Sequence, residues 1–423
     1  MHTLIRLLRA GTRNTASEDP NTPSPNRARA RMLSLVETFV ETFSPGDTQP
    51  LFLCSVPGRT ELGGNHTDHQ HGRVLCAAVD SDLLACAVPN GLPVVRLRSE
   101  GYAPLDIDLT ALQPKESERN TSAALVRGVA AGVQNAGFPV SGFDVCITSD
   151  VPAGSGLSSS AAFEVLMGNF FNRFCCASRL EPMQIARIGQ FAEQVYFGKP
   201  SGLMDQTACA LGGLLSIDFA NPNQPVVEPI SCDFAKSGYT LCIINTGSCH
   251  ADLTENYAAI PQEMEQIAAH FGAKVLRDVP ESAVREQLPA LRKAYGDRAV
   301  LRALHFYEEN RRADTEADAL SMDDFPAFLR LVNESGASSI LSLQNIHTGD
   351  PGEQSLALAL TLGRELLGGD GAIRVHGGGF AGTVQAFVPT EALPHFKEGM
   401  EAVFGVGSCL CLRFRSTGAC FLT

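Results

Sequence analysis

Several common features are missing from this chain, and each absence narrows what the protein can be. No apolar run reaches the length of a transmembrane span, and we find no internal repeat and no coiled-coil heptads. Basic residues are scarce: 33 Lys and Arg stand against 46 Asp and Glu, a formal net charge of -13. This balance argues against nucleic acid or an anionic membrane surface as the main partner. A nucleotide is not excluded, because backbone N–H groups can hold phosphates whatever the net charge.

Otherwise the composition is that of a globular protein, with 44% hydrophobic and 19% charged residues among 423. A chain of this length is expected to form about two domains. The 13 cysteines are odd in number, scattered and mostly set in apolar runs, which predicts core thiols in a reducing compartment and a cytoplasmic protein. Cys409 and Cys411 form a lone Cys-x-Cys, which we interpret as alternating strand residues and not as a metal site.

The N-terminal extension, residues 1–26, has two interpretations. Residues 1–16 contain three Arg and no acidic residue behind a Leu- and Ile-rich start, as a transit peptide can. A short surface helix followed by a Pro/Asn/Ser linker explains the same residues and is favoured. The long apolar segment of a secretion signal is absent, so secretion is not expected.

The order of the predicted elements indicates an α+β fold. Residues 27–43 carry apolar side chains at helical spacing, and a β-rich stretch follows. Helices come next, then two strands around a polar, Pro-rich connection near residues 220–229, then helices and a final group of strands. This order is not a regular βαβ alternation. We therefore divide the chain into two domains, residues 27–225 and 226–423.

The stretch from Gly58 to Gly72, GRTELGGNHTDHQHG, is dense in polar side chains and lies between two apolar runs, LFLCSV and VLCAAV. So much hydrogen-bonding capacity between core-like strands is costly without a partner, and a polyhydroxylated ligand such as a sugar is one such partner. A transition metal held by the histidines up to His71 is the alternative, but this turn lacks the fixed facing geometry of H-E-x-x-H on a helix. The candidate residues of the stretch are Arg59, Glu61, Asn65, His66, Asp68 and His69.

Residues 150–162, DVPAGSGLSSSAA, follow a predicted strand and lead into a predicted helix. Gly154 and Gly156 permit positive φ and a close approach of the backbone. The unpaired N–H groups at the start of the helix, together with its dipole, favour an anion. Three consecutive serines add donors and a candidate Mg²⁺ ligand. An ordinary Ser-capped helix after a glycine turn is the alternative.

The third glycine cluster, HGGGFAGT, follows the two glycine-containing stretches above and contains G-x-G-x-x-G at Gly377, Gly379 and Gly382. A dinucleotide-binding fingerprint requires a strand before it and a helix after it. Here TVQAFV follows and is typical of a strand, so we reject the dinucleotide interpretation. The chain also lacks the GxxxxGK[ST] phosphate loop, so a nucleotide must be held in another way.

Four motifs of the chain resemble those of the galactokinases, which are GHMP kinases. GRTELGGNHTDHQHG resembles their signature, roughly GRVNLIGEHTDY, and GLMDQ resembles their G-[IL]-M-D-Q. PAGSGLSSSAA and GGGFAG resemble the second and third GHMP motifs. The resemblance runs from about residue 50 to the C-terminus. It implies a two-lobed α+β fold, with an N-terminal lobe like domain 2 of ribosomal protein S5 and a ferredoxin-like C-terminal lobe.

The resemblance also implies the chemistry. Asp205 is expected to face the sugar hydroxyl that attacks ATP and either to accept its proton or only to orient it, while Arg59 stabilises the developing charge. Glu193 and Ser160 are expected to bind Mg²⁺. Without the resemblance, a helix N-cap for Asp205 and a solvated helix position for Glu193 are the alternatives.

Two sets of binding residues are implied by the same resemblance. The ATP phosphates are expected at Gly154, Ser155, Gly156, Leu157, Ser158, Ser159, Ser160 and Ala161. The sugar is expected at Asn65, His66, Asp68, Gly202 and Tyr257. For Tyr257, which belongs to the segment 245–260, an ordinary core or surface tyrosine is the alternative.

The expected activity is ATP- and Mg²⁺-dependent phosphorylation of the C1 hydroxyl of D-galactose, by a monomer or weak homodimer with no nucleic-acid or membrane partner. The chain departs from the signature at Asn65, where galactokinases carry a Glu that accepts a hydrogen bond from the sugar O6. A neutral Asn tolerates a C6 carboxylate better, so galacturonate is one alternative substrate and N-acetylgalactosamine another. Some relatives that have lost part of the phosphate loop only sense the sugar, but SSSAA is complete here and an enzyme is favoured.

Overall fold

The computed structural model describes residues 25–422 except residue 47, residue 153 and residues 248–252. Nearly all of the predicted N-terminal extension therefore lies outside the described residues. Within the described part, no helix combines the length and the apolar character needed to cross a membrane. None of the described cysteines forms a disulfide, as the prediction of core thiols requires.

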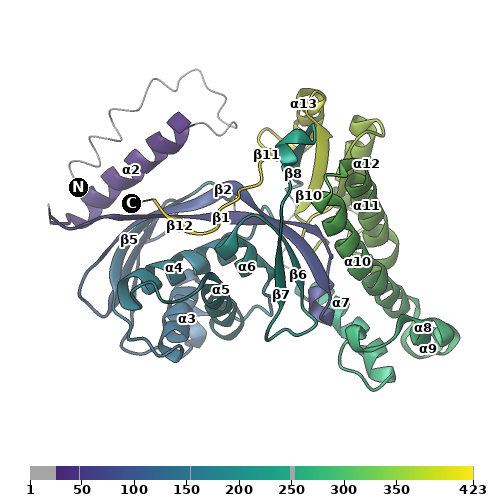
Figure 1. The fold of residues 1–423 in the computed structure, drawn as a ribbon, viewed down its shortest axis with the longest axis horizontal. Coiled ribbons are helices and arrows are strands. Elements are labelled where there is room, and N and C mark those ends of the chain that lie inside the picture. Colours follow the sequence, from purple (N-terminus) through teal and green to yellow (C-terminus); the bar gives the residue numbers. More distant parts are fainter. Residues whose placement is uncertain (1–24, 47, 153, 248–252, 423) are drawn as a thin grey trace.

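An eight-stranded sheet forms the larger layer of the molecule (Figure 1). Its main path has the order β12-β1-β2-β5-β3-β4, and β6 and β7 extend it from β2. The neighbours are antiparallel except for β3 and β5. The strands are β1 (Phe52–Gly63), β2 (Arg73–Pro89), β3 (Val94–Ser99), β4 (Leu105–Asp108), β5 (Phe143–Ser149), β6 (Leu214–Asp218), β7 (Val226–Ile230) and β12 (Cys420–Phe421).

Helices cover both faces of this sheet, which explains why β1 is buried along nearly its whole length. Figure 1 shows α2 on one face and α3 to α6 on the other. Apolar residues of α2, among them Val36 and Phe39, pack against Leu53, Leu84 and Cys86 of the sheet. These helices are α2 (Pro25–Phe43), α3 (Ser122–Asn135), α4 (Ser159–Cys175), α5 (Pro182–Phe191) and α6 (Met204–Leu211).

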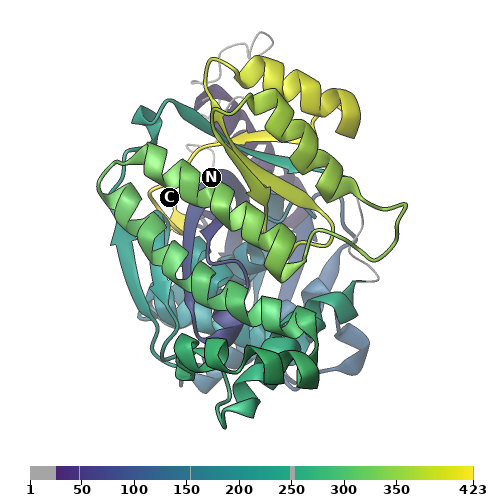
Figure 2. The ribbon, with the colours of Figure 1, turned by 90° about the vertical axis from the view of Figure 1, so that its right-hand side faces the viewer.

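A second sheet of four strands has the order β11-β8-β10-β9 and is antiparallel throughout. Its strands are β8 (Tyr239–Asn245), β9 (Ala372–Val375), β10 (Thr383–Pro389) and β11 (Cys409–Leu412). Figure 2 shows the long green helices of this half facing the viewer, with the yellow C-terminal helix at the top. The helices of this half are α7 (Thr254–His270), α8 (Glu281–Glu286), α9 (Leu288–Tyr295), α10 (Asp297–Ser321), α11 (Phe325–Ser338), α12 (Ser355–Leu367) and α13 (Leu393–Phe404).

The two sheets divide the chain between residues 230 and 239, because β7 pairs with β6 and β8 opens the second sheet. The boundary at 225/226 stays a prediction. The C-terminal residues then return to the first sheet, where Cys420 and Phe421 pair with β1. The expected α+β order of strands, helices and strands is present. The third glycine cluster joins β9 to the antiparallel β10, as the rejection of the dinucleotide interpretation requires.

Candidate active site

The polar signature forms the connection between β1 and β2, and its backbone is unusual. Gly64 has a φ of +83°, and a Cβ there would lie 2.3 Å from the carbonyl oxygen of Arg73. His66 has a φ of +59°, which is uncommon for a residue with a side chain. A non-glycine residue is held in this region only where its surroundings impose it.

Helix α10 packs against the signature and holds this backbone by hydrogen bonds. Glu309 Oε1 accepts hydrogen bonds from the backbone N–H groups of Gly64 and Asn65, both at 3.3 Å. His305 Nε2 lies 3.0 Å from the carbonyl oxygen of Asn65. Burial would raise the pKa of Glu309. The interactions with His305, Arg312 and Arg374 and the hydrogen bond from the Ser335 hydroxyl outweigh burial and lower the pKa to about 2. An ionised buried carboxylate therefore fixes the backbone of the signature.

The glycine–serine loop lies between β5 and α4, as its flanking sequence predicts. The backbone N–H of Arg59 donates to Leu157 O at 3.0 Å, and the Arg59 guanidinium donates to Gly156 O. Ser158 precedes α4 with a φ of +57°. The first turn of α4 therefore opens toward Arg59, with the unpaired N–H groups that an anion requires.

Arg59 and Asp205 form a bidentate ion pair, with Nε to Oδ1 at 2.7 Å and Nη2 to Oδ2 at 2.8 Å. The Ser158 hydroxyl also donates to Asp205. Burial would raise the pKa of Asp205, but the charge and the hydrogen bonds of Arg59 outweigh it and hold the pKa below its usual value. Asp205, in the first turn of α6, is therefore an ionised acceptor beside the loop.

Glu193 lies in a π-helical turn, η3 (Ala192–Phe197), and receives hydrogen bonds from three side chains. Ser160 Oγ and Lys199 Nζ each lie 3.0 Å from Glu193 Oε1, and Gln206 Nε2 lies 2.9 Å from Oε2. A hydroxyl and a carboxylate oxygen are hard donors that suit Mg²⁺. The Lys199 ammonium binds the same carboxylate oxygen as Ser160, so Glu193 attracts positive charge in this structure.

The third glycine cluster connects several predicted sugar-site residues. His66 Nε2 lies 2.9 Å from Gly378 O, and the Tyr257 hydroxyl donates to Gly379 O at 2.7 Å. A Cβ on Gly378 would come within 2.4 Å of the Tyr257 ring, so the close contact depends on glycine. Burial and the neighbouring His69 lower the pKa of His66 to about 4, which keeps its ring neutral at pH 7.

A cavity of about 240 Å³ brings the predicted catalytic pair and phosphate loop together. Its lining comprises Arg59, Asp205, Lys199, residues 154–160 and residues 376–379. Gly202 and Asp68, both predicted to bind the sugar, lie against each other, since a Cβ on Gly202 would come within 2.1 Å of the Asp68 carboxylate. The Ala161 side chain packs in the core, which leaves only its backbone to the phosphate site.

Comparison with known proteins identifies the family. Residues 37–89 match the galactokinase galactose-binding signature, and residues 124–213 match the N-terminal domain of the GHMP kinases. The galactokinase of Streptomyces coelicolor is 31% identical over 375 residues, which cover 87% of this chain and 92% of that protein. A galactokinase of Actinobacillus pleuropneumoniae is 32% identical over 346 residues, covering 81% and 86%.

The chain belongs to the galactokinase family. Solved structures agree on the fold: Lactococcus lactis galactokinase complexed with galactose matches with a TM-score of 0.79 at 24% identity, over 92% of this chain and 99% of that one. Methanococcus jannaschii mevalonate kinase matches with a TM-score of 0.62 at 16% identity, over 88% and 100%. The two-lobed GHMP kinase fold predicted from the motifs is confirmed.

Asn65, which was predicted to contact the sugar, lies in a buried hydrogen-bond network, and its contact with the sugar stays a prediction. Its side chain is fully buried. Nδ2 donates to Glu61 Oε1 at 3.0 Å and to Gly377 O at 2.7 Å, and Oδ1 accepts from Asn345 Nδ2 at 2.9 Å. Both amide hydrogens and one acceptor position of the amide oxygen are therefore used inside the protein, which ties Asn65 to Glu61, the third glycine cluster and Asn345.

Alignment with the galactokinase signature explains this placement. Where GRVNLIGEHTDY has Asn, this chain has Glu61, and where the signature has Glu, it has Asn65. The amide and the carboxylate have therefore exchanged positions, and they remain hydrogen bonded to each other.

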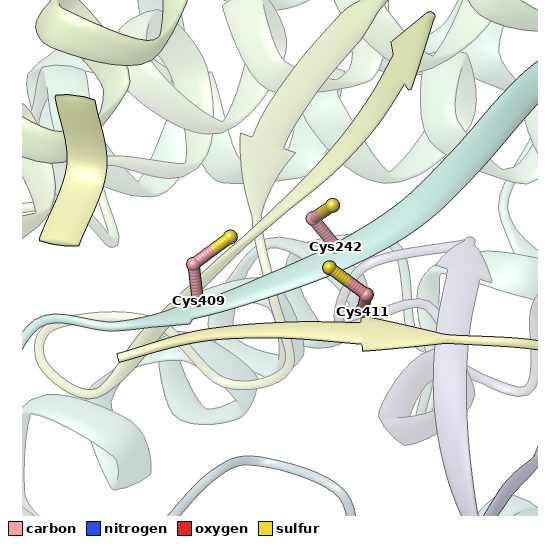
Figure 3. Close-up of side chains that lie close together, drawn as sticks. All are labelled: Cys242, Cys409 and Cys411. Atoms are coloured by element: carbon pink, nitrogen blue, oxygen red, sulfur yellow. The ribbon is translucent and has the colours of Figure 1, made fainter. Parts of the chain in front are cut away.

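Several residues of the site were not predicted from the sequence. Lys199 and His376 line the cavity, and Asn345 supports Asn65. The polar face of α10 was also missed, although its spacing of three and four residues could have revealed it. That face comprises Arg302, His305, Glu309, Arg312 and Glu316. The histidines of the signature do not form a metal-binding group in the described structure, where the one such group is Cys242, Cys409 and Cys411 (Figure 3).

Proposed function

We propose that this protein transfers the γ-phosphoryl group of ATP to the C1 hydroxyl of D-galactose, giving α-D-galactose 1-phosphate and ADP. The observation that carries the proposal is the bidentate Arg59–Asp205 pair, which lies in one cavity with the glycine–serine loop. Membership of the galactokinase family supports the choice of sugar.

In this proposal, the Asp205 carboxylate accepts a hydrogen bond from the C1 hydroxyl. Its low pKa keeps it ionised at pH 7, so it can orient the hydroxyl and take up its proton as the bond to phosphorus forms. Arg59 holds the carboxylate by two hydrogen bonds and brings positive charge to the transferring group. Phosphoryl transfer depends mainly on such positioning and charge neutralisation.

Ser160 and Glu193 are the residues that we propose for Mg²⁺, because Ser160 Oγ lies 3.0 Å from Glu193 Oε1 and the same carboxylate oxygen binds the Lys199 ammonium. When bound, the ion would neutralise charge on the ATP phosphates. The Lys199 ammonium must then leave Glu193. Because Lys199 lines the cavity, the ATP phosphates are its proposed partner once Mg²⁺ is bound. His66, Asp68, Gly202 and Tyr257 are proposed to bind the sugar.

A coupled assay of ADP release tests this function, with galactose, galacturonate, N-acetylgalactosamine and glucose compared at equal concentration. We expect galactose to give the highest kcat/KM, and chelation of Mg²⁺ by excess EDTA to abolish ADP release. Turnover with galacturonate above that with galactose would overturn the proposed substrate. No turnover with any sugar, despite galactose binding, would support a sugar sensor. Cytoplasmic location and a monomer or weak homodimer stay predictions.

A further inference from the structure

A series of hydrogen bonds connects β1 to the third glycine cluster through four side chains. Thr383 and Gln385 lie on the same face of β10, because strand side chains alternate between faces. His376 lies opposite Thr383, with its backbone N–H donating to Thr383 O at 3.1 Å. Gln385 Nε2 lies 2.7 Å from Thr60 Oγ1, which lies 3.0 Å from His376 Nε2. His376 Nδ1 in turn lies 3.1 Å from Thr383 Oγ1.

The two ends of this series differ in their surroundings. Thr60 and Gln385 are fully buried in the interior. His376 and Thr383, by contrast, line the cavity of the candidate active site. Thr383 Oγ1 lies against the glycine–serine loop, since a Cβ on Gly156 would come within 2.8 Å of it. A hydrogen that the series leaves unused at this end would therefore face the phosphate site.

Gln385 fixes the direction of the series. Its Nε2 also lies 2.9 Å from Glu61 O, a carbonyl oxygen that can only accept, so this nitrogen carries the hydrogens and donates to Thr60. The single hydrogen of the Thr60 hydroxyl is then left for His376 Nε2, the other partner of that oxygen among the described residues. His376 Nδ1 consequently carries the ring proton and donates it to Thr383 Oγ1.

The opposite tautomer of His376 would leave a hydrogen unpaired in the interior. If Nε2 carried the proton, Thr60 Oγ1 would accept twice, and its own hydrogen would have no acceptor among the described residues at a fully buried position. Such an unmade hydrogen bond is costly. Burial and the charges of Arg59 and Arg374 lower the pKa of His376 well below its usual value, so the neutral ring has only one proton to place.

We propose that the Thr383 hydroxyl donates a hydrogen bond to a phosphate oxygen of ATP, and that His376 is the positioning residue that orients this hydroxyl. The inference rests on ATP as the phosphoryl donor of the proposed function. It adds a hydroxyl from the second sheet to the N–H groups that the glycine–serine loop presents from the first. Hydrogen bonds to charged oxygens are the stronger ones, so the contact should be visible in the affinity for ATP.

Calorimetric titration of ATP into the sugar-free protein tests the contact without requiring turnover. Thr383→Val keeps the shape of the side chain and removes the hydroxyl, so we expect the Kd of ATP to rise about tenfold. Thr383→Ser keeps the hydroxyl and should stay within about threefold of the parent. Adenosine has no phosphate, and its Kd, measured by saturation-transfer NMR, should be unchanged in Thr383→Val. Thr390→Val, at an exposed position directly after the same strand, is the control and should change neither Kd.

Nitrogen NMR of the histidine rings tests the part given to His376, and it remains informative if Thr383→Val fails to fold. The His376 signals, identified by their loss in His376→Gln, should show the proton on Nδ1 at pH 7. A proton on Nε2 would overturn the proposal.

The binding measurements can contradict the proposal in three ways: parental ATP affinity in Thr383→Val, an equal loss in Thr383→Ser, or an equal loss for adenosine. A parent that does not bind ATP would overturn the proposed function and this contact with it, whereas a failure of galactose as substrate would leave the ATP result standing.

Discussion

At the scale of single residues, the exchange of Glu61 and Asn65 shows how a motif can differ from its family and keep its interactions. The carboxylate at position 61 pairs with Arg374 and accepts from Asn65, while the Asn65 amide reaches the third glycine cluster and Asn345. One buried carboxylate and one buried amide are thus preserved as a pair. Changing either one alone disturbs the charge of a fully buried cluster.

Asn65→Glu is therefore expected to be destabilising, because it buries a second carboxylate next to Glu61. The loss should be about 3 kcal/mol or more in the free energy of unfolding. The double variant Glu61→Asn/Asn65→Glu restores the family arrangement and should recover at least half of that loss. Thermal melts of the parent, both single variants and the double variant measure the coupling. Additive effects of the two single changes would show that the residues do not act as a pair.

Lys199 gives a second prediction at this scale. Lys199→Met keeps the length of the side chain and removes the ammonium from Glu193, so Mn²⁺, used as an observable substitute for Mg²⁺, should bind more tightly to the nucleotide-free protein. Binding of ATP in EDTA should weaken about tenfold, because a charged contact to phosphate is lost. Spectroscopic Mn²⁺ titration and fluorescence binding of ATP measure the two effects.

Lys236→Met, at an exposed position, is the control for Lys199. Lys199→Arg should restore part of the ATP binding. Weaker Mn²⁺ binding in Lys199→Met, or unchanged ATP binding in EDTA, would contradict the position proposed for this side chain.

At the scale of elements, α10 is the support of the signature loop. Glu309 and Glu316 lie on the same buried face but differ in their contacts. Glu309 accepts hydrogen bonds from two backbone N–H groups, the Ser335 hydroxyl and Arg312. Neither carboxylate oxygen of Glu316 has a hydrogen-bond partner among the described residues. The same helix therefore carries Glu309, whose carboxylate is held by hydrogen bonds, and Glu316, whose carboxylate has no such partner among the described residues.

Glu309→Gln is expected to raise the KM for galactose more than tenfold and to leave the KM for ATP within about twofold, because the signature loop loses its anchor while the glycine–serine loop does not. The unfolding free energy should fall by about 3 kcal/mol. Steady-state kinetics and denaturant unfolding measure the two effects. Glu316→Gln is the matched control on the same face. Equal effects of the two substitutions would contradict the assignment.

The pH dependence of Glu316→Gln is a separate prediction. Burial, followed by the charge of Glu309, raises the pKa of Glu316 well above its usual value. The folded state therefore keeps a proton that the unfolded state releases above its pKa of about 4.3. The contribution of this carboxyl to stability is complete below that pKa and is lost as pH rises toward the folded value. Gln has no such proton.

The stability of Glu316→Gln relative to the parent should consequently increase from pH 5 to pH 8, by up to about 1.4 kcal/mol per pH unit. Urea unfolding of both proteins at pH 5, 6, 7 and 8 measures the difference. A difference that stays constant over this range would mean that the folded protein holds Glu316 ionised.

At the scale of the whole molecule, the site is assembled from both sheets. Arg374 on β9 pairs with Glu61 on β1 and donates to Leu62 O at 2.7 Å. His376, directly after β9, reaches Thr60 on β1 at 3.0 Å. The buried Arg374–Glu61 ion pair and His376 thus hold the third glycine cluster against the signature. The glycine–serine loop contacts the same strand, β1, because Leu157 O accepts a hydrogen bond from the backbone N–H of Arg59.

The parts of this assembly that could be predicted are those that the resemblance to the galactokinase motifs implies. The glycine–serine loop, Asp205 beside Arg59, and Ser160 beside Glu193 are adjacent as expected. What could not be predicted depends on pairing between distant segments. The polar face of α10 resembles a solvated helix surface until the helix is known to lie beneath the signature. Asn65 is polar and precedes a site histidine, and only the packed structure shows that it is buried. Cys409 and Cys411 meet Cys242 only through the register of β8 and β11.

Asp205, held ionised by Arg59, is proposed to accept the proton of the C1 hydroxyl of galactose. Single-turnover formation of galactose 1-phosphate by Asp205→Asn, with galactose binding measured by calorimetry on the same sample, tests it most directly. We expect a rate at least about 100-fold below that of the parent, with the galactose Kd within a few fold. A near-parental rate in a variant that binds galactose normally would contradict it.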